Sequence, residues 1–291
     1  MAIGDDFKTF CDKIAVQDVE SIRYRYKRLT KQLNKDFWSL ESETAHSIYA
    51  GSFGRGTATE KTSDIDMVFW LPSKYWEIYD EYSGNGQSAM LQAVRNSIKN
   101  TYSSSAIGAD GQIVYVNFDD DRRFEVLPAF ELTDDSFRYP DSNDGGSWKN
   151  TNPRPEKKAM VERDSECNGN LRLLCRMMRH WRLTWNADIS GLLIDTLAYN
   201  FLENYENKAK SFVYYDWISR DFLKYLSDQD RDKKYWLSPG ARQQVYRIGS
   251  FERKASTSYD VALQAIAVYD KEKPAAGRAK WREIYGNSFP N

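Results

Sequence analysis

An apolar run interrupted by two acids, Asp64-Ile-Asp-Met-Val-Phe-Trp70, is the feature that most constrains how this chain can fold. Side chains alternate across an extended strand, so Asp64 and Asp66 project from one face while Ile65 and Met67 project from the other. The run therefore predicts a strand with one face in an apolar core and the other in a polar site. Two carboxylates held this close repel each other, and a bound cation relieves that repulsion.

A turn rich in glycine, Gly51-Ser-Phe-Gly-Arg-Gly-Thr57, comes shortly before the two acids. A Gly-Ser pair between a strand and a short helix lets backbone N–H groups and a hydroxyl approach phosphate oxygens closely. We therefore expect Gly51 and Ser52 to bind a nucleotide triphosphate. Magnesium prefers oxygen ligands shared between carboxylates and phosphates, so we expect Mg²⁺ beside that nucleotide.

A third acid interrupts a later apolar strand, Arg122-Arg-Phe-Glu-Val-Leu-Pro-Ala-Phe130. Phe124 and Val126 share one face of this strand, and Glu125 points to the other. We expect Asp64, Asp66 and Glu125 to be the catalytic residues and the ligands of two Mg²⁺ ions, for which Mn²⁺ can substitute. In two-metal catalysis, ions about 3.5–4 Å apart activate the attacking hydroxyl and stabilise the leaving pyrophosphate. A lone D-x-D is most often a solvated strand end, so the prediction depends on its combination with the Gly-Ser pair and with Glu125.

The predicted secondary structure changes near residue 140. Before it, four short β-rich runs alternate with turn signals: His46–Ala50, Asp64–Leu71, Gln112–Phe118 and Phe124–Phe130. Tyr139–Trp148, extended by Asn152–Pro155, is a loop by composition. We therefore expect a catalytic domain over 1–150 and a helical nucleotide-binding domain over 151–291.

Helical patterns dominate the second half. Leu174, Met177, Met178 and Trp181 follow the i, i+3, i+4, i+7 spacing of a buried helical stripe. Helices are expected over 168–182, 189–204, 212–227, 256–271 and 275–285, with a bracing N-terminal helix over about residues 15–33. A sheet followed by helices predicts the α+β class.

Composition excludes several other functions. The two histidines, His46 and His180, lie in no catalytic-triad or zinc-binding signature. The three cysteines form no C-x-x-C pair, so we expect Cys11, Cys167 and Cys175 to be buried, reduced thiols. The 41 basic and 42 acidic residues nearly balance, so no general nucleic-acid-binding surface is implied. No long apolar run could cross a bilayer, and the acidic start of the chain does not resemble a signal peptide. We expect a cytoplasmic protein.

The order of these motifs resembles the cyclic-oligonucleotide synthase group of nucleotidyltransferases, which includes bacterial dinucleotide cyclases, animal cyclic GMP-AMP synthase and oligoadenylate synthase. Flanking segments extend the resemblance to nearly the whole chain: Gly145–Lys149 with Asn152-Pro153, Ile189–Ile194 and Trp281–Pro290. It implies a polymerase β-like palm with a mixed sheet and a C-terminal helical domain, bilobed around one cleft. This sequence departs from the pattern of the group at Glu125, because the third acid of the group is often Asp.

A basic stripe follows the helix predicted over 168–182, with Arg172, Arg176 and Arg179 at i, i+4, i+7 spacing. The resemblance places a phosphate-binding lysine where Arg179 stands, and Ser190 downstream as another phosphate contact. Arginine binds phosphate as a planar fork, so its geometry would differ from that of lysine. The alternative is that the stripe is a solvated helix face.

The resemblance implies an enzyme that condenses nucleoside triphosphates, with ATP and GTP favoured, into a cyclic oligonucleotide. A purine cyclic dinucleotide is favoured over a trinucleotide. The implied setting is bacterial antiphage signalling, in which the product activates a separate effector protein. Alternatives are a transferase acting on RNA ends, on a small molecule or on a protein, an enzyme making linear oligonucleotides, a duplex-sensing synthase, and an inactive binding module. The presence of all three acids argues against an inactive binding module. The near-neutral net charge argues against a stable nucleic-acid partner.

Overall fold

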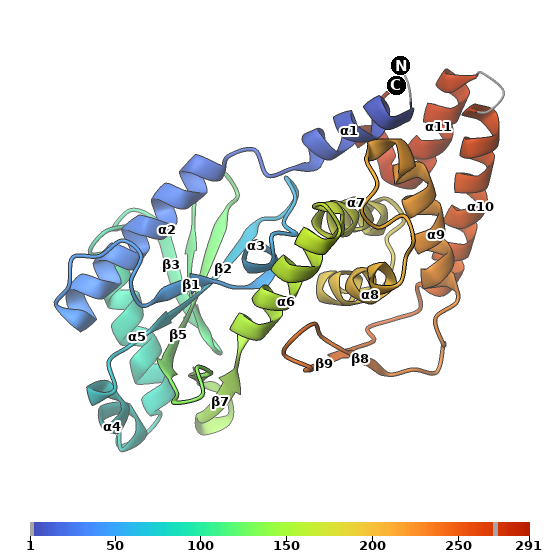
Figure 1. Ribbon diagram of the computed structural model, residues 1–291. Coiled ribbons are helices and arrows are strands. Elements are labelled where there is room, and N and C mark those ends of the chain that lie inside the picture. Colours follow the sequence, from blue (N-terminus) through green and yellow to red (C-terminus); the bar gives the residue numbers. More distant parts are fainter. Residues whose placement is uncertain (1–2, 270–272) are drawn as a thin grey trace. The chain divides into compact units, whose positions relative to one another are not determined.

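The computed structural model describes residues 3–269 and 273–291 (Figure 1). The chain forms two compact units, and each unit is discontinuous in sequence. We call the first the sheet unit; it consists of Gln17–Gly54 and Thr62–Arg154. We call the second the helical unit; it consists of Met1–Val16, Arg55–Lys61 and Pro155–Asn291.

The sheet unit contains one seven-stranded sheet. Its strands are β1 (Ser47–Tyr49), β2 (Asp64–Trp70), β3 (Ala106–Asp110), β4 (Ile113–Asn117), β5 (Arg123–Glu131), β6 (Phe137–Asp141) and β7 (Ser147–Thr151). The order is β1-β2-β5-β4-β3, and β6 pairs with both β5 and β7. Strands β2 and β5 are parallel and the other pairs are antiparallel, so the sheet is mixed.

One face of the sheet is apolar because its strands alternate as the sequence predicts. Ile65, Met67, Phe124 and Val126 are all fully buried, which confirms the predicted apolar faces of β2 and β5. Four α-helices lie wholly or mostly in this unit, besides a π-helical turn over Asn34–Trp38: α2 (Val19–Leu33), α3 (Gly51–Arg55), α4 (Lys74–Asp80) and α5 (Gly86–Lys99). Helix α5 contacts β3, β4 and β5, and its buried residues recur at helical spacing. The core of the sheet unit therefore lies between this sheet face and α5.

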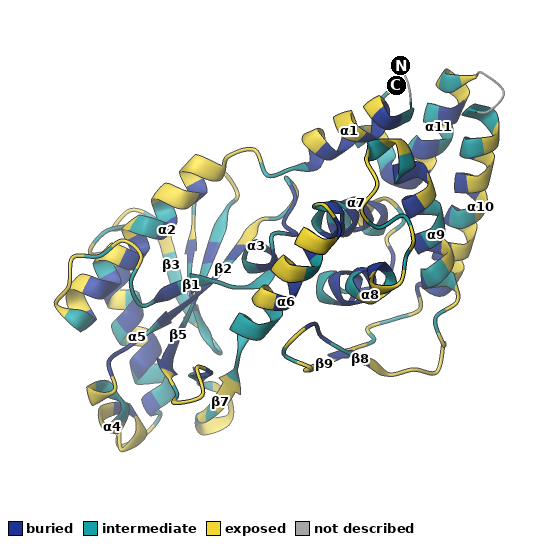
Figure 2. Cartoon of the chain, in the orientation of Figure 1, coloured by how far each residue is buried: buried dark blue, intermediate teal, exposed yellow. Residues whose placement is uncertain are grey.

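The helical unit contains seven helices and a short hairpin among the described residues. They are α1 (Ile3–Ile14), α6 (Pro153–Glu166), α7 (Asn170–Thr184), α8 (Gly191–Glu203), α9 (Tyr215–Ser227), α10 (Glu252–Tyr269), α11 (Pro274–Tyr285), β8 (Tyr235–Leu237) and β9 (Gln244–Tyr246). Five of them correspond to the helices predicted after residue 168. Buried and exposed bands alternate along α10 and α11 (Figure 2), and Leu174, Met177, Met178 and Trp181 are buried as the spacing predicts.

Helix α1, which the sequence analysis did not predict, packs into an aromatic cluster with the last helix. The ring of Phe7 lies 5.0 Å from that of Trp281, and the ring of Phe10 lies 4.7 Å from that of Tyr285. All four side chains are fully buried. Aromatic pairs of this kind add to the free energy gained from burial alone. Side chains of α1 and α11 therefore contribute to one core.

The predicted loop over Tyr139–Trp148 and Asn152–Pro155 is wrong. Strands β6 and β7 pair as an antiparallel hairpin, and Gly146 turns between them with φ +100°. Pro153 begins α6, where a missing N–H costs no hydrogen bond. Glycine, proline and asparagine mark tight turns and helix starts as well as loops, and composition does not distinguish these cases.

The helix predicted over about residues 15–33 corresponds to α2, which begins at Val19, and the structure adds α1 before it, over Ile3–Ile14. The compact units differ from the predicted ranges 1–150 and 151–291 mainly in two segments, since 1–16 and 55–61 belong with the helical unit. The aromatic cluster accounts for the first segment. The bracing role of the N-terminal helix and the shared cleft remain predictions.

Candidate active site

The three predicted acids lie on one face of two adjacent strands. Strands β2 and β5 run parallel in a register that pairs Asp66 with Glu125 and Asp64 with Arg123. Neighbouring residues in register project their side chains to the same face of a sheet. Asp64 is exposed, and Asp66 and Glu125 are half-buried. The sheet therefore brings together acids that are far apart in the sequence, on the face opposite its apolar core.

The acids interact electrostatically. Burial raises the pKa of Glu125, Arg123 acts against that rise, and the nearby carboxylates of Asp64 and Asp66 raise the pKa further. The side chain of Glu125 is turned toward Arg123, whose Nε lies 3.0 Å from Glu125 Oε1. In the part of the chain that the structure describes, no three His, Cys, Asp or Glu side chains form a group that could hold a metal ion. The acids are thus neighbours whose oxygens do not converge.

Gly51 lies against the carboxylate of Asp66. A Cβ atom added at Gly51 would fall 1.8 Å from Asp66 Oδ2, and the φ of Gly51 is +53°. Two backbone hydrogen bonds of the preceding residue, Ala50, fix this turn. The Ala50 amide donates to the backbone oxygen of Asp66 at 2.9 Å, and the Gly54 amide donates to Ala50 O at 2.7 Å. Glycine is therefore required here both by the backbone conformation and by the close approach of the acid. Ser52 follows in the first turn of α3 and is 8% exposed.

Arg179 and Ser190 each have a partner within the helical unit. Arg179 Nη2 donates to Asp195 Oδ2 at 2.7 Å and to Thr57 Oγ1 at 3.2 Å. Ser190 caps the start of α8, since its hydroxyl accepts a hydrogen bond from the Leu193 amide at 3.1 Å. The sequence analysis considered a phosphate contact or a solvated face for Arg179, and the structure adds a third role, contact with a buried acid.

The other two arginines of the stripe also donate to the segment that contains Arg55, Gly56 and Thr57. Arg172 Nε donates to Arg55 O at 3.2 Å, and Arg176 Nη2 donates to Gly56 O at 2.8 Å. The basic stripe of α7 therefore binds the end of the glycine-rich turn within the helical unit.

Asp195 is the centre of this network and was missed by the sequence analysis. It is fully buried and accepts hydrogen bonds from Arg55 Nε and Thr57 Oγ1, both at 2.8 Å, besides the one from Arg179. Burial alone would raise the pKa of Asp195, but Arg179 and Arg55 outweigh burial and hold the pKa below its usual range. A single acid inside the apolar run of α8 was the signal that could have identified it.

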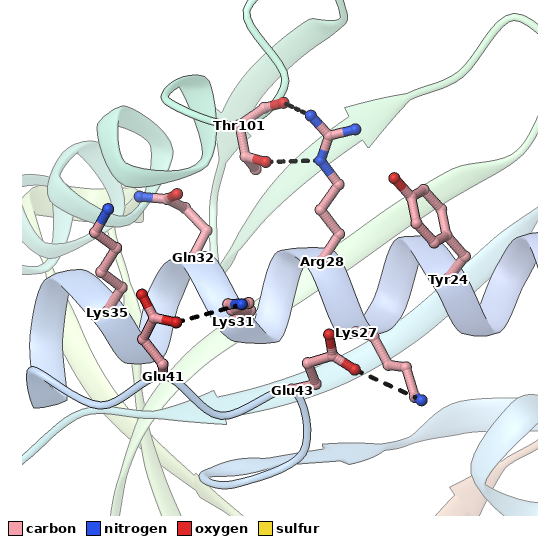
Figure 3. A pocket seen from close by; sticks show the side chains of 9 residues that line it. All are labelled: Tyr24, Lys27, Arg28, Lys31, Gln32, Lys35, Glu41, Glu43 and Thr101. Atoms are coloured by element: carbon pink, nitrogen blue, oxygen red, sulfur yellow. Dashed lines mark hydrogen bonds and ion pairs between the residues drawn. The ribbon is translucent and has the colours of Figure 1, made fainter.

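An open groove of about 520 Å³ follows one side of α2 in the sheet unit (Figure 3). Four basic and two acidic side chains are among those that line it: Lys27, Arg28, Lys31, Lys35, Glu41 and Glu43. Lys31 Nζ lies 3.4 Å from Glu41 Oε2, and Lys27 Nζ lies 3.6 Å from Glu43 Oε2. Dashed lines mark both ion pairs in Figure 3. The groove thus carries both signs of charge, and none of the three predicted catalytic acids lines it.

The histidines and cysteines have structural surroundings. His46 stacks on Trp38 with ring centroids 3.6 Å apart, and His180 Nε2 lies 2.8 Å from Glu60 Oε1. The three cysteines are free and buried, as the sequence predicts. Among the helices of residues 3–269 and 273–291, none is both long enough and apolar enough to cross a membrane.

The α+β fold is confirmed, and it combines a mixed sheet with a Gly-Ser turn at the D-x-D strand and an acid on the parallel neighbouring strand. Residues 1–164 match the model of the Second Messenger Oligonucleotide or Dinucleotide Synthetase domain, SMODS. The chain belongs to this family.

The chain is also similar to known relatives in sequence and to solved structures in fold. The chain is 23% identical over 183 residues to a probable cyclic nucleotide synthase of Bacillus cereus, covering 58% of this chain and 52% of that protein. It is 25% identical over 180 residues to the cyclic AMP-AMP-GMP synthase of Enterobacter hormaechei, covering 57% and 45%. The chain thus spans about half the length of these relatives. The structure of Escherichia coli CdnC in complex with HORMA-deltaN has the same fold, with a TM-score of 0.73, 17% identity and coverage of 99% and 98%.

Proposed function

We propose that this protein joins nucleoside triphosphates into a cyclic oligonucleotide and releases pyrophosphate. In each step the oxygen of a ribose hydroxyl attacks the α-phosphorus of a triphosphate, which belongs to another nucleotide during chain formation and to the other end of the linear product during ring closure. A P–O bond forms, and the bond to the leaving pyrophosphate breaks. ATP and GTP are the favoured substrates, and a purine cyclic dinucleotide is the favoured product. SMODS membership supports this proposal, as does the similarity to a probable cyclic nucleotide synthase and to a cyclic AMP-AMP-GMP synthase.

The observation that carries the proposal is the in-register pair of Asp66 and Glu125 on parallel strands, with Asp64 on the same face. Nucleotidyltransferases of this kind use divalent metal ions. The donor type fits such ions, because Mg²⁺ prefers carboxylate oxygens, and the oxygens of the three acids would have to converge from the positions that they have in the structure. Asp64, Asp66 and Glu125 would hold two Mg²⁺ ions. Bound there, the ions would activate the attacking hydroxyl and neutralise charge on the leaving group.

The residues themselves supply positioning and proton transfer. Glu125 would accept the proton of the attacking hydroxyl. Gly51 leaves room for Asp66 and, with Ser52, would contact the triphosphate. Arg179 and Ser190 are proposed as further phosphate contacts, for which each would have to give up a partner that it has in the structure.

The test uses the purified chain with each combination of NTPs and Mg²⁺ or Mn²⁺. Products are treated with phosphatase and analysed by mass spectrometry, with Asp66→Asn as the control. We expect a phosphatase-resistant product from NTPs alone and one pyrophosphate for each phosphodiester bond. Ring closure is favoured because the second step is effectively intramolecular. Linear, phosphatase-sensitive products, or a strict need for an RNA or small-molecule acceptor, would contradict the cyclase and leave the nucleotidyltransferase class standing.

We further propose that the product is a second messenger in cytoplasmic antiphage defence and acts on a separate effector protein. The family's description as second-messenger synthetases supports the signalling role. The test compares phage plating on cells that carry the gene in its native neighbourhood with cells that carry the Asp66→Asn allele. Equal plating on both would contradict the defensive role without affecting the enzymatic one.

A further inference from the structure

Arg123 places a positive charge in the row of acids, although the sequence analysis gave it no role. It begins β5, in register with Asp64 on β2 and with Asn117 on β4. Because it precedes Glu125 by two residues, its side chain projects from the same face. Its Nε lies 3.0 Å from Glu125 Oε1. The carboxylate that completes the acidic set is thus already paired with a cation from the chain.

The ion pair between Arg123 and Glu125 is short, but its geometry is not that of a hydrogen bond. Arg123 Nε has no hydrogen-bond acceptor with acceptable geometry, even though Glu125 Oε1 is within reach. The side chains of Arg123 and Glu125 are 35% and 23% exposed, so water screens the pair. Ion pairs of this kind contribute little and exchange easily. A divalent cation could therefore displace the guanidinium from Glu125.

Tyr115 gives Arg123 a second contact. The guanidinium carbon of Arg123 lies 4.1 Å from the centre of the Tyr115 ring, within the range of a cation–π contact. The ring lies across Gly108 of β3, where an added Cβ would fall 2.2 Å from the Tyr115 hydroxyl oxygen. Gly108 therefore leaves the space that the ring occupies. Arg123 can stay on the ring after it loses the carboxylate.

We propose that Arg123 is a positioning residue that holds the Glu125 carboxylate until a divalent cation replaces it, with the Tyr115 ring retaining the displaced guanidinium. This inference rests on the proposed function, because it takes Glu125 as a metal ligand. It explains why the three acids are adjacent and yet do not converge. Its consequence is that Arg123 weakens the binding of divalent cations by the nucleotide-free protein.

The test measures Mn²⁺ binding to the nucleotide-free protein by calorimetry and by electron paramagnetic resonance. Arg123→Gln is expected to bind Mn²⁺ about two- to fivefold more tightly, the change expected from removing a partly exposed ion pair. Arg138→Gln is the matched control. Arg138 is on β6 of the same unit, with its guanidinium 5.5 Å from the Trp76 ring centre, and its Nε donates to Asn150. The control variant should bind Mn²⁺ like the parent.

Further variants separate the possible outcomes. Arg123→Lys keeps the charge and should bind Mn²⁺ like the parent, and adding Glu125→Gln to Arg123→Gln should abolish the gain. Equal or weaker Mn²⁺ binding by Arg123→Gln, or the same gain in Arg138→Gln, would overturn the inference alone. If Asp66→Asn binds Mn²⁺ as the parent does, the acids are not the metal site, and the proposed roles of these residues fail together with the inference.

Discussion

The backbone of Gly51 lies so close to Asp66 that a Cβ atom at position 51 would fall 1.8 Å from the Asp66 carboxylate. This contact links the turn expected to bind phosphate with an acid expected to bind metal. One methyl group added at position 51 would therefore disturb both the turn and the acid.

Gly51→Ala should displace the Asp66 carboxylate and reduce product formation by about a hundredfold, because misplacing a catalytic group by about 1 Å has effects of that size. Gly145→Ala is the control, since Gly145 has φ +88° but no atom within 4 Å of an added Cβ. Both variants should lose some thermal stability from backbone strain, and only Gly51→Ala should lose activity. Similar product yields from the two variants in the mass-spectrometric assay would contradict the contact's importance.

Asp64→Asn and Asp66→Asn should each abolish turnover without unfolding the protein. Each change removes one charge from a group of carboxylates that repel one another, so the melting temperature in EDTA should stay the same or rise slightly. Product assays and thermal melts of the same preparations provide the check. Activity above a few per cent of the parent in either variant would exclude that residue from the catalytic set.

Arg179→Ala should destabilise the helical unit. It leaves the fully buried Asp195 carboxylate with one fewer cation, and breaking a buried ion pair costs about 3–5 kcal/mol. Arg182→Ala, on the same helix, is the control and should have a much smaller effect on urea unfolding. If Arg179→Ala unfolds like the parent but binds ATP ten- to a hundredfold more weakly, about the loss of one charge-assisted contact, its main role is phosphate binding.

His46 should make stability depend on pH. Burial lowers the pKa of His46 from its ordinary value of 6.5, so the folded state favours the neutral ring. The resulting stability is fully present above about pH 6.5 and is lost as the pH falls through the lowered folded-state pKa. The free energy of unfolding of the parent relative to His46→Gln should therefore decrease on acidification from pH 7 to 5. A difference that stays constant over this range would show that burial does not perturb the ring.

Local chemistry was the part of the site that could be predicted from sequence. The alternation of Asp64 and Asp66 with Ile65 and Met67 follows from backbone geometry, and the structure buries the apolar pair as expected. Glycine at position 51 was also interpretable locally. The buried stripe of α7 was predictable for the same reason, because helical spacing is a property of a short segment.

The sequence by itself thus determined strands β1, β2, β4 and β5, the helices after residue 168, and the residue types that point to nucleotidyl transfer. Only the tertiary structure decided that Asp66 pairs with Glu125, that Arg123 holds Glu125, and that Asp195 holds Arg179. These contacts join residues on different elements or depend on side-chain rotamers. Their energies are therefore set by strand register and burial, which the spacing of residues along one segment does not encode.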